Sequence, residues 1–236
     1  MPTEAKNPET HLADAAALFD IDGVLVDSAE AHRRAWERLG EEIGRPFGEE
    51  LFRRTFGQRN DSILAAWLGP GLPPDEAERL SARKEELYRE LVRRGAIRVY
   101  PGVPELLRAL PEQGFALAVA SSGPRPNVEL VLEILGVQGL VGAAVSAEDV
   151  TRGKPDPEPF LRAAERLGLA PERCIVVEDS VHGIEAARRA GMRSVAVLTS
   201  TDEHRLRAAG ADLVVPEAGA LSASLLRELL AKGGRN

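Results

Sequence analysis

Short apolar runs alternate along the chain with longer segments in which apolar residues recur at helical spacing. The runs cover residues 15–19, 115–120, 141–145, 174–177, 194–198 and 213–215. Helical spacing is found at 104–110, 126–135, 157–167 and 184–190, with glycine stops at Gly136, Gly168 and Gly191. Apolar strands separated by helices are typical of a parallel sheet covered on both faces. The pattern therefore predicts an α/β fold.

Residues 27–98 carry a different pattern, which is almost purely helical. Ser28 is in position to cap a helix that ends at Gly44, and further helices are expected at 49–55, 61–68 and 75–94. Joints near Val26 and Arg98 would let this insertion move over the carboxyl ends of the strands, where open α/β sheets bind ligands. The expected organisation is an N-terminal tail at 1–13, a core domain at 14–26 and 99–236, and a helical cap at 27–98.

Composition narrows the classes of function. The chain has 236 residues, 44% of them hydrophobic, a formal net charge of −7 and no basic run, which argues against nucleic acid or an anionic membrane as partner. No stretch reaches transmembrane length, and the N-terminal residues have no apolar segment typical of a signal peptide. The single cysteine, Cys174, excludes a disulfide within the chain and is expected to pack as a small hydrophobe. We expect a cytoplasmic protein, monomeric or weakly homo-oligomeric.

The first apolar run ends in Asp20-Ile21-Asp22-Gly23-Val24. Side chains alternate along a strand, so Asp20 and Asp22 would point the same way if the strand continued, and Gly23 lets the chain turn. Two converging carboxylates repel each other unless a proton or a cation such as Mg²⁺ intervenes. One carboxylate can then act as nucleophile while the other handles protons. A simple Asx-type turn is the alternative explanation.

Two later segments bring further polar groups to the same sheet edge. The second run ends in Ser121-Ser122-Gly123, whose hydroxyls and amides suit a phosphate oxygen, although a serine-capped helix start would look the same. Lys154 is one of four lysines among 30 Lys and Arg residues. A lysine is a compact charge that fits between a carboxylate and a phosphate oxygen, and a solvated loop lysine is the alternative.

The fourth run ends in Glu178-Asp179, again an apolar strand followed by acids. Asp179 with Asp20 would form a hard oxygen site for Mg²⁺, completed by the Asp22 carbonyl, water and substrate. Glu178 would ligate directly or through water. A helix N-cap is the alternative for Asp179.

Together these motifs resemble the haloacid dehalogenase-like superfamily over residues 14 to about 225. Asp20-Ile21-Asp22-Gly23-Val24, Ser121, Lys154 and Glu178-Asp179 match its four motifs in order. The resemblance implies a Rossmann-like parallel sheet core with an inserted α-helical cap. It also implies an aspartyl-phosphate mechanism with Asp20 as nucleophile, Asp22 as acid and base, and Ser121, Ser122 and Lys154 holding phosphate. The metal site would be Asp20, Asp22, Glu178 and Asp179 around Mg²⁺. Dehalogenation is disfavoured, because a halide needs no proton from Asp22.

The stretch from Ser28 to Gly44 resembles the β-phosphoglucomutase branch and its sugar-phosphatase relatives. In the mutases a lysine and an arginine around a cap glycine grip the phosphate that does not react, whereas here Phe56 holds the lysine position and Arg59 remains, followed by Asn60. This departure favours a phosphatase for a small phosphorylated sugar or similar metabolite. His32 and Lys84 favour the alternative, a sugar phosphomutase. A non-catalytic phosphometabolite sensor is the third hypothesis.

Overall fold

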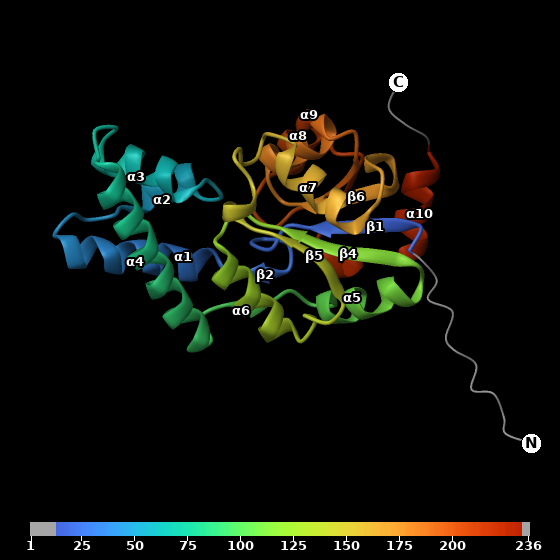
Figure 1. Ribbon diagram of the computed structural model, residues 1–236, viewed down its shortest axis with the longest axis horizontal. Helices are drawn as coiled ribbons and strands as arrows, with labels where there is room; N and C mark the ends of the chain where they lie inside the picture. The colour runs from blue at the N-terminus through green and yellow to red at the C-terminus, as the bar shows by residue number, and fades with distance from the viewer. Residues whose placement is uncertain (1–12, 233–236) are drawn as a thin grey trace, which may run out of the picture.

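The computed structural model describes residues 13–232 and places helices on both faces of a parallel sheet (Figure 1). Six parallel strands pair in the order β5-β4-β1-β6-β7-β8. Their bounds are β1 (Ala15–Phe19), β4 (Phe115–Ala120), β5 (Val141–Val145), β6 (Cys174–Glu178), β7 (Arg193–Val197) and β8 (Leu213–Val215). Because the strand order reverses at β1, the carboxyl ends of β1, β4 and β6 border a topological switch point. The predicted Rossmann-like α/β fold is confirmed.

The helices divide between two layers because alternate residues of each strand are apolar on opposite faces. Ala15, Ala17 and Phe19 of β1 pack in one cluster, and Ala16 and Leu18 pack in another. The first cluster includes α5 (Val103–Glu112), α6 (Arg125–Leu135) and α10 (Ala223–Ala231). The second includes α7 (Glu158–Leu167) and α8 (Val181–Arg189), and α9 (Glu203–Ala209) packs beside α8. Both faces of the sheet are therefore covered.

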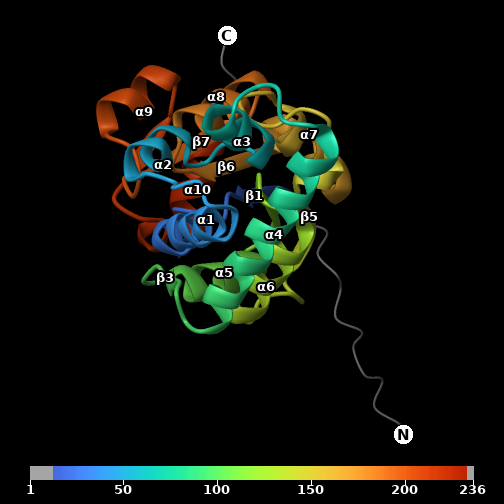
Figure 2. The ribbon, with the colours of Figure 1, turned by 90° about the vertical axis from the view of Figure 1, so that its left-hand side faces the viewer.

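Four helices lie between Asp27 and Arg98 in sequence and form a helical insertion at the left of Figure 1. They are α1 (Ala29–Ile43), α2 (Glu49–Thr55), α3 (Asn60–Leu68) and α4 (Pro74–Arg93). Trp36, stacked on Phe47 at 5.3 Å between ring centroids, is part of an apolar cluster formed mainly by these helices. Two short antiparallel strands, β2 (Val26–Asp27) and β3 (Arg98–Val99), connect the insertion to the sheet. Figure 2 shows the insertion in front of the sheet.

Several local expectations differ from the structure. Helices α9 and α10 were not predicted. Helix α9 has only seven residues and buries only Leu206 and Ala209, so it shows little helical periodicity. Strand β7 begins one residue before the predicted 194–198 run. The predicted tail at 1–13 lies outside the described residues except for Ala13.

Cys174 is fully buried in the core, where burial raises the pKa of its thiol to about 12. Packing therefore accounts for this residue. Within residues 13–232, no helix combines the length and apolar character that a membrane span requires.

Candidate active site

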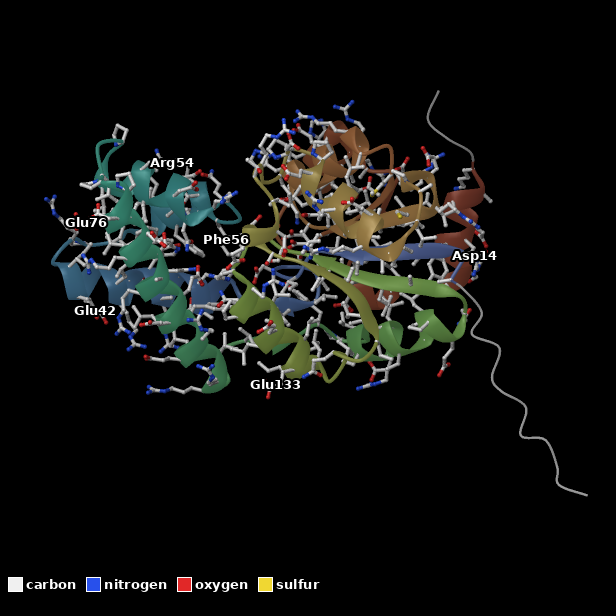
Figure 3. The ribbon with its side chains drawn as sticks, in the orientation of Figure 1. Asp14, Glu42, Arg54, Phe56, Glu76 and Glu133 are labelled. Atoms are coloured by element: carbon white, nitrogen blue, oxygen red, sulfur yellow. The ribbon has the colours of Figure 1, made fainter. Side chains whose placement is uncertain are left out.

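A cavity of about 320 Å³ is lined jointly by the strand ends and the helical insertion. The core contributes acidic, serine and lysine side chains, and the insertion contributes polar and aromatic ones. The lining includes Asp20, Asp22, Ser122, Lys154, Glu178 and Asp179 from the core, and His32, Phe56, Asn60, Lys84 and Glu85 from the insertion. In Figure 3, Phe56 lies on the side of the insertion that faces the sheet.

Lys154 donates hydrogen bonds to groups at the ends of three strands. Its Nζ donates to Asp20 Oδ1 at 2.5 Å, to Glu178 Oε1 at 2.6 Å and to the Ala120 carbonyl at 3.0 Å. These acceptors follow or end β1, β6 and β4, so the strand order brings them together. Burial alone would lower the pKa of Lys154, but the charges of Asp20 and Glu178 outweigh it and raise the pKa. Lys154 is therefore a buried ammonium and not a solvated loop residue.

Glu178 uses both carboxylate oxygens within the core. Oε1 accepts from Lys154, while Oε2 accepts from the backbone N–H of Asp179 at 2.8 Å and of Ser180 at 2.9 Å. A Cβ on Gly183 would lie 1.9 Å from Glu178 Oε1, so the first turn of α8 must carry glycine for this carboxylate to fit. Sequence reasoning missed Gly183, since no local turn signal marks it.

Asp179 completes a cluster of buried acids that can hold a metal. One oxygen from each of Asp20, Glu178 and Asp179 lies within 4.8 Å of the others. Gly23, at φ +79°, makes room for this arrangement, because a Cβ there would lie 2.0 Å from Asp179 Oδ2. Burial, together with the charges of Glu178 and Asp20, raises the pKa of Asp179 well above its usual value.

Charge balance tests whether a cation fits this cluster. Lys154 is the one cation within ion-pair distance of the three acids in residues 13–232, and it contacts Asp20 and Glu178 but not Asp179. Burial and the nearby Glu178 and Asp22 raise the pKa of Asp20 to about 7 despite Lys154. Buried carboxylates with insufficient positive charge suit a hard divalent cation such as Mg²⁺.

Asp22 has different partners, and all of them come from the start of the insertion or from α4. Ser28 donates to Asp22 Oδ1, and His32 Nε2 lies 3.3 Å from the same oxygen. Burial would raise the pKa of Asp22, but His32, the Ser28 hydrogen bond and the charge of Lys84 lower it to about 2. Ser28 stands at the N-cap position of α1, but its side chain does not cap the helix, which corrects the expected capping role.

The remaining predicted residues fall in different places. Ser121 is buried, and its Oγ accepts from the Gly123 N–H at 3.0 Å, while α6 begins only after Pro124, so Ser121 is not the helix cap. Ser122 lines the cavity. Arg59 packs beside Gly153 and lines a separate small pocket next to the two serines and Lys154.

On the insertion side, Lys84 is 2% exposed and lies between His32 and Glu85, which excludes a solvated helix face. Asn60 donates to Glu85 Oε1 at 2.8 Å. Sequence reasoning missed Glu85 and the exposed lining residues Arg53, Arg54 and Arg205. Glu85, Arg53 and Arg54 lie on predicted helices, where a charged residue is usually solvated, and Arg205 lies on α9, which the pattern did not predict.

The sequence matches the haloacid dehalogenase-like hydrolase family over residues 15–191. The chain is 35% identical over 201 residues to validoxylamine A 7'-phosphate phosphatase of Streptomyces hygroscopicus subsp. limoneus, covering 85% of this chain and 92% of that one. It is 33% identical to β-phosphoglucomutase of Bacillus subtilis, covering 90% and 94%. It is 34% identical to the chloroplastic 5-amino-6-(5-phospho-D-ribitylamino)uracil phosphatase of Arabidopsis thaliana, over 90% of this chain, but spans 57% of that relative's length.

Solved structures agree with the sequence relatives. The β-phosphoglucomutase of Clostridium difficile superposes with a TM-score of 0.81 at 26% identity, covering 92% of this chain and 97% of that one. The relatives include both phosphatases and phosphomutases, and the acidic cluster and buried lysine described above occupy the matched region. The chain therefore belongs to the haloacid dehalogenase-like hydrolase family, within its phosphatase and phosphomutase members.

Proposed function

We propose that the protein is a Mg²⁺-dependent phosphatase that hydrolyses a small phosphorylated sugar or related metabolite through a phosphoaspartate on Asp20. The observation that carries this proposal is the pair Asp20 and Asp22, which line one cavity but have pKa values shifted in opposite directions. Two carboxylates in different environments can divide nucleophilic and acid-base roles. The phosphatase relatives support the same reaction class.

The reaction balances with the groups in the cavity. An Asp20 oxygen attacks phosphorus, the bond to the leaving oxygen breaks, and Asp22 gives that oxygen a proton. Water then attacks the phosphoaspartate and gives its proton to Asp22, which releases inorganic phosphate and restores both residues. Lys154 and the Ser121 and Ser122 segment would bind the phosphoryl oxygens.

Asp22 needs a proton for the first step, although its contacts lower its pKa to about 2 in the substrate-free cavity. A dianionic phosphate placed beside it raises the pKa of a neighbouring carboxyl, because the second charge disfavours ionisation. Substrate binding would therefore prepare Asp22 as the acid. The ionised form suits its later role as base.

Asp20, Asp179 and Glu178 would hold Mg²⁺, with the Asp22 carbonyl as a further ligand. Bound Mg²⁺ would offset the negative charge that the phosphate brings to these acids. Glu178 has both oxygens engaged by protein donors, so we propose that Asp20 and Asp179 are the principal carboxylate ligands. We also propose that β2 and β3 bound the helical insertion and act as its hinge.

The second candidate is a sugar phosphomutase, in which a sugar hydroxyl replaces water at the phosphoaspartate. His32 and Lys84 in the cavity wall and the Bacillus relative favour it. Phe56 opposes it, because an aromatic ring lines the cavity where the mutase pattern has a lysine. A bisphosphate intermediate would then be held less securely while it turns over.

Phosphorus NMR of the protein with Mg²⁺, β-glucose 1-phosphate and a trace of glucose 1,6-bisphosphate tests the choice. We expect inorganic phosphate as the main product. Accumulating glucose 6-phosphate with little inorganic phosphate would show a mutase instead. If neither forms, a panel of phosphorylated metabolites decides whether the protein hydrolyses any phosphate monoester.

A further inference from the structure

A buried carboxylate outside the acidic cluster joins the helical insertion to the core. Glu85 on α4 is 6% exposed; its Oε1 accepts from Lys84 Nζ at 2.9 Å and Asn60 at 2.8 Å, and its Oε2 accepts from Asn127 Nδ2 at 2.6 Å. Burial would raise its pKa, but the charge of Lys84 and the hydrogen bonds from Lys84 and Asn60 lower the pKa to about 2. A buried charge is tolerated only where it is paired and hydrogen-bonded, so these contacts fix the position of Glu85.

Asn127 is the core side of this contact. It lies in the first turn of α6, the helix after the Ser121–Gly123 segment, and is 6% exposed. Its Nδ2 donates to Glu85, and its Oδ1 accepts from Arg89 Nη1 at 2.9 Å. Both ends of one side-chain amide thus bind α4. Asn127 is not among the residues that line the cavity.

The chain of contacts continues from Glu85 to Asp22. Lys84 Nζ lies 2.8 Å from His32 Nδ1, and a lysine ammonium can only donate, so Nδ1 accepts. The imidazole proton is then on Nε2, which faces Asp22 Oδ1. Tyr88 stacks on the His32 ring at 4.0 Å between centroids and fixes its plane. His32 therefore meets Asp22 in this orientation only while α4 is held in place.

We infer that Asn127 and Glu85 are positioning residues for the reaction: their hydrogen bond holds α4 against α6 and so holds Lys84 and His32 against Asp22. The inference rests on the proposed function, since it assigns both residues a part in the chemistry of Asp22. A protein that reaches this arrangement only part of the time binds substrate more weakly in proportion to that fraction. Loss of the contact therefore raises KM more than it lowers kcat.

A charge exchange tests this contact. Asn127→Asp places a second carboxylate against Glu85, and we expect kcat/KM to fall about 10-fold or more, mainly through KM. Adding Glu85→Gln restores one donor and one acceptor across the contact, and the carboxylate introduced at position 127 still accepts from Arg89. The double variant should therefore recover most of the lost kcat/KM. A double variant no better than Asn127→Asp, or an Asn127→Asp protein equal to wild type, overturns the inference.

The matched control is Glu42→Gln, which removes the charge of an exposed ion pair inside the insertion. In that pair Arg83 Nη2 donates to Glu42 Oε1 at 2.7 Å. It should change kcat/KM by no more than about twofold. If Asn127→Asp does not fold, Asn127→Ala removes the contact without adding charge, and we expect KM to rise about fivefold with kcat nearly constant. An unchanged KM in Asn127→Ala would contradict the inference.

Hydrogen exchange separates failure of this inference from failure of the proposed function. Loss of the contact should speed amide exchange in β2 and β3 about 10-fold, and the double variant should slow it again. The change in amide exchange is expected even if the wild-type protein hydrolyses no phosphate monoester. Absence of hydrolysis would reject the proposed function but not the contact between Asn127 and Glu85. Unchanged exchange in Asn127→Asp would reject the contact as a tether.

Discussion

The core half and the insertion half of the cavity are held in place by different forces. On the core side, the backbone N–H of Asp20 donates to the Val177 carbonyl at 3.0 Å, and Lys154 bonds the Ala120 carbonyl, so sheet register fixes the acids. On the insertion side, His32, Lys84 and Glu85 meet the core through side-chain contacts with Asp22 and Asn127. Backbone pairing therefore fixes the acids of the core half, whereas side-chain contacts place the polar groups of the insertion half.

Replacing Asp20, the proposed nucleophile of the core half, should have the largest effect. Asp20→Asn should lower turnover about 10⁴-fold or more, as expected for the loss of an attacking group. It should not lower the melting temperature of the metal-free protein, because it removes a charge that burial disfavours. Retained turnover would exclude a phosphoaspartate on Asp20. A ligand response that persists without any turnover in the wild type would instead support a sensor.

Removing the proposed Mg²⁺ should have the next largest effect. Chelation should lower activity about 10³-fold, the equivalent of several kcal/mol, and added Mg²⁺ should restore it. Activity that survives EDTA would contradict the metal site of the core half.

The same site predicts a pH dependence of stability. The pKa of Asp20 is raised to about 7 in the folded metal-free protein from 3.8, so the folded state binds the extra proton between these values. Stability of the metal-free protein should therefore fall as pH rises through that window. Mg²⁺ competes with the proton, so its gain in melting temperature should be larger at about pH 8 than at about pH 5. A larger gain at the lower pH would contradict this assignment.

Asp22→Asn sharpens the comparison because Asp22 is a core residue with insertion partners. We expect a loss of about 10²-fold with a sugar phosphate, whose leaving oxygen needs a proton. The loss should be smaller with p-nitrophenyl phosphate, because p-nitrophenolate leaves readily without one. Equal losses with both substrates would argue against an acid role and for a purely structural one.

The smallest effect is expected at the exposed arginines of the lining. Within residues 13–232, the guanidinium groups of Arg53, Arg54 and Arg205 form no ion pair, and positive charge there favours approach of an anionic substrate. Arg205→Ala should lower kcat/KM about threefold, with a weaker dependence on salt. Arg108→Ala, an exposed arginine on α5, is the control and should change neither. An equal loss of kcat/KM in Arg205→Ala and Arg108→Ala would mean that the net charge of the protein, and not the charge at the cavity, controls substrate approach.

The core half could be anticipated from the sequence, because the ends of parallel strands meet at one edge. Three of the residues end or follow an apolar run and one lies in a loop between two runs: Asp20, Ser121, Glu178 and Lys154. The strand order then brings them together. Sequence reasoning could not place Arg59 beside Gly153 or find Asn127. A helix pattern shows which face is apolar, but not how a helix of the insertion sits on a helix of the core.

Because the chain has so few lysines, the NMR signals of two of them can report separately on the two halves of the cavity. Of four lysines in the chain, Lys154 lies in the core half of the cavity and Lys84 in the insertion half, and both are among the lining residues. Isotope-labelled lysine would therefore give a spectrum with very few signals, two of which come from the cavity. A ligand that changes only the Lys154 signal would contact the core half alone. A ligand that changes the signals of both Lys154 and Lys84 would contact both halves of the cavity.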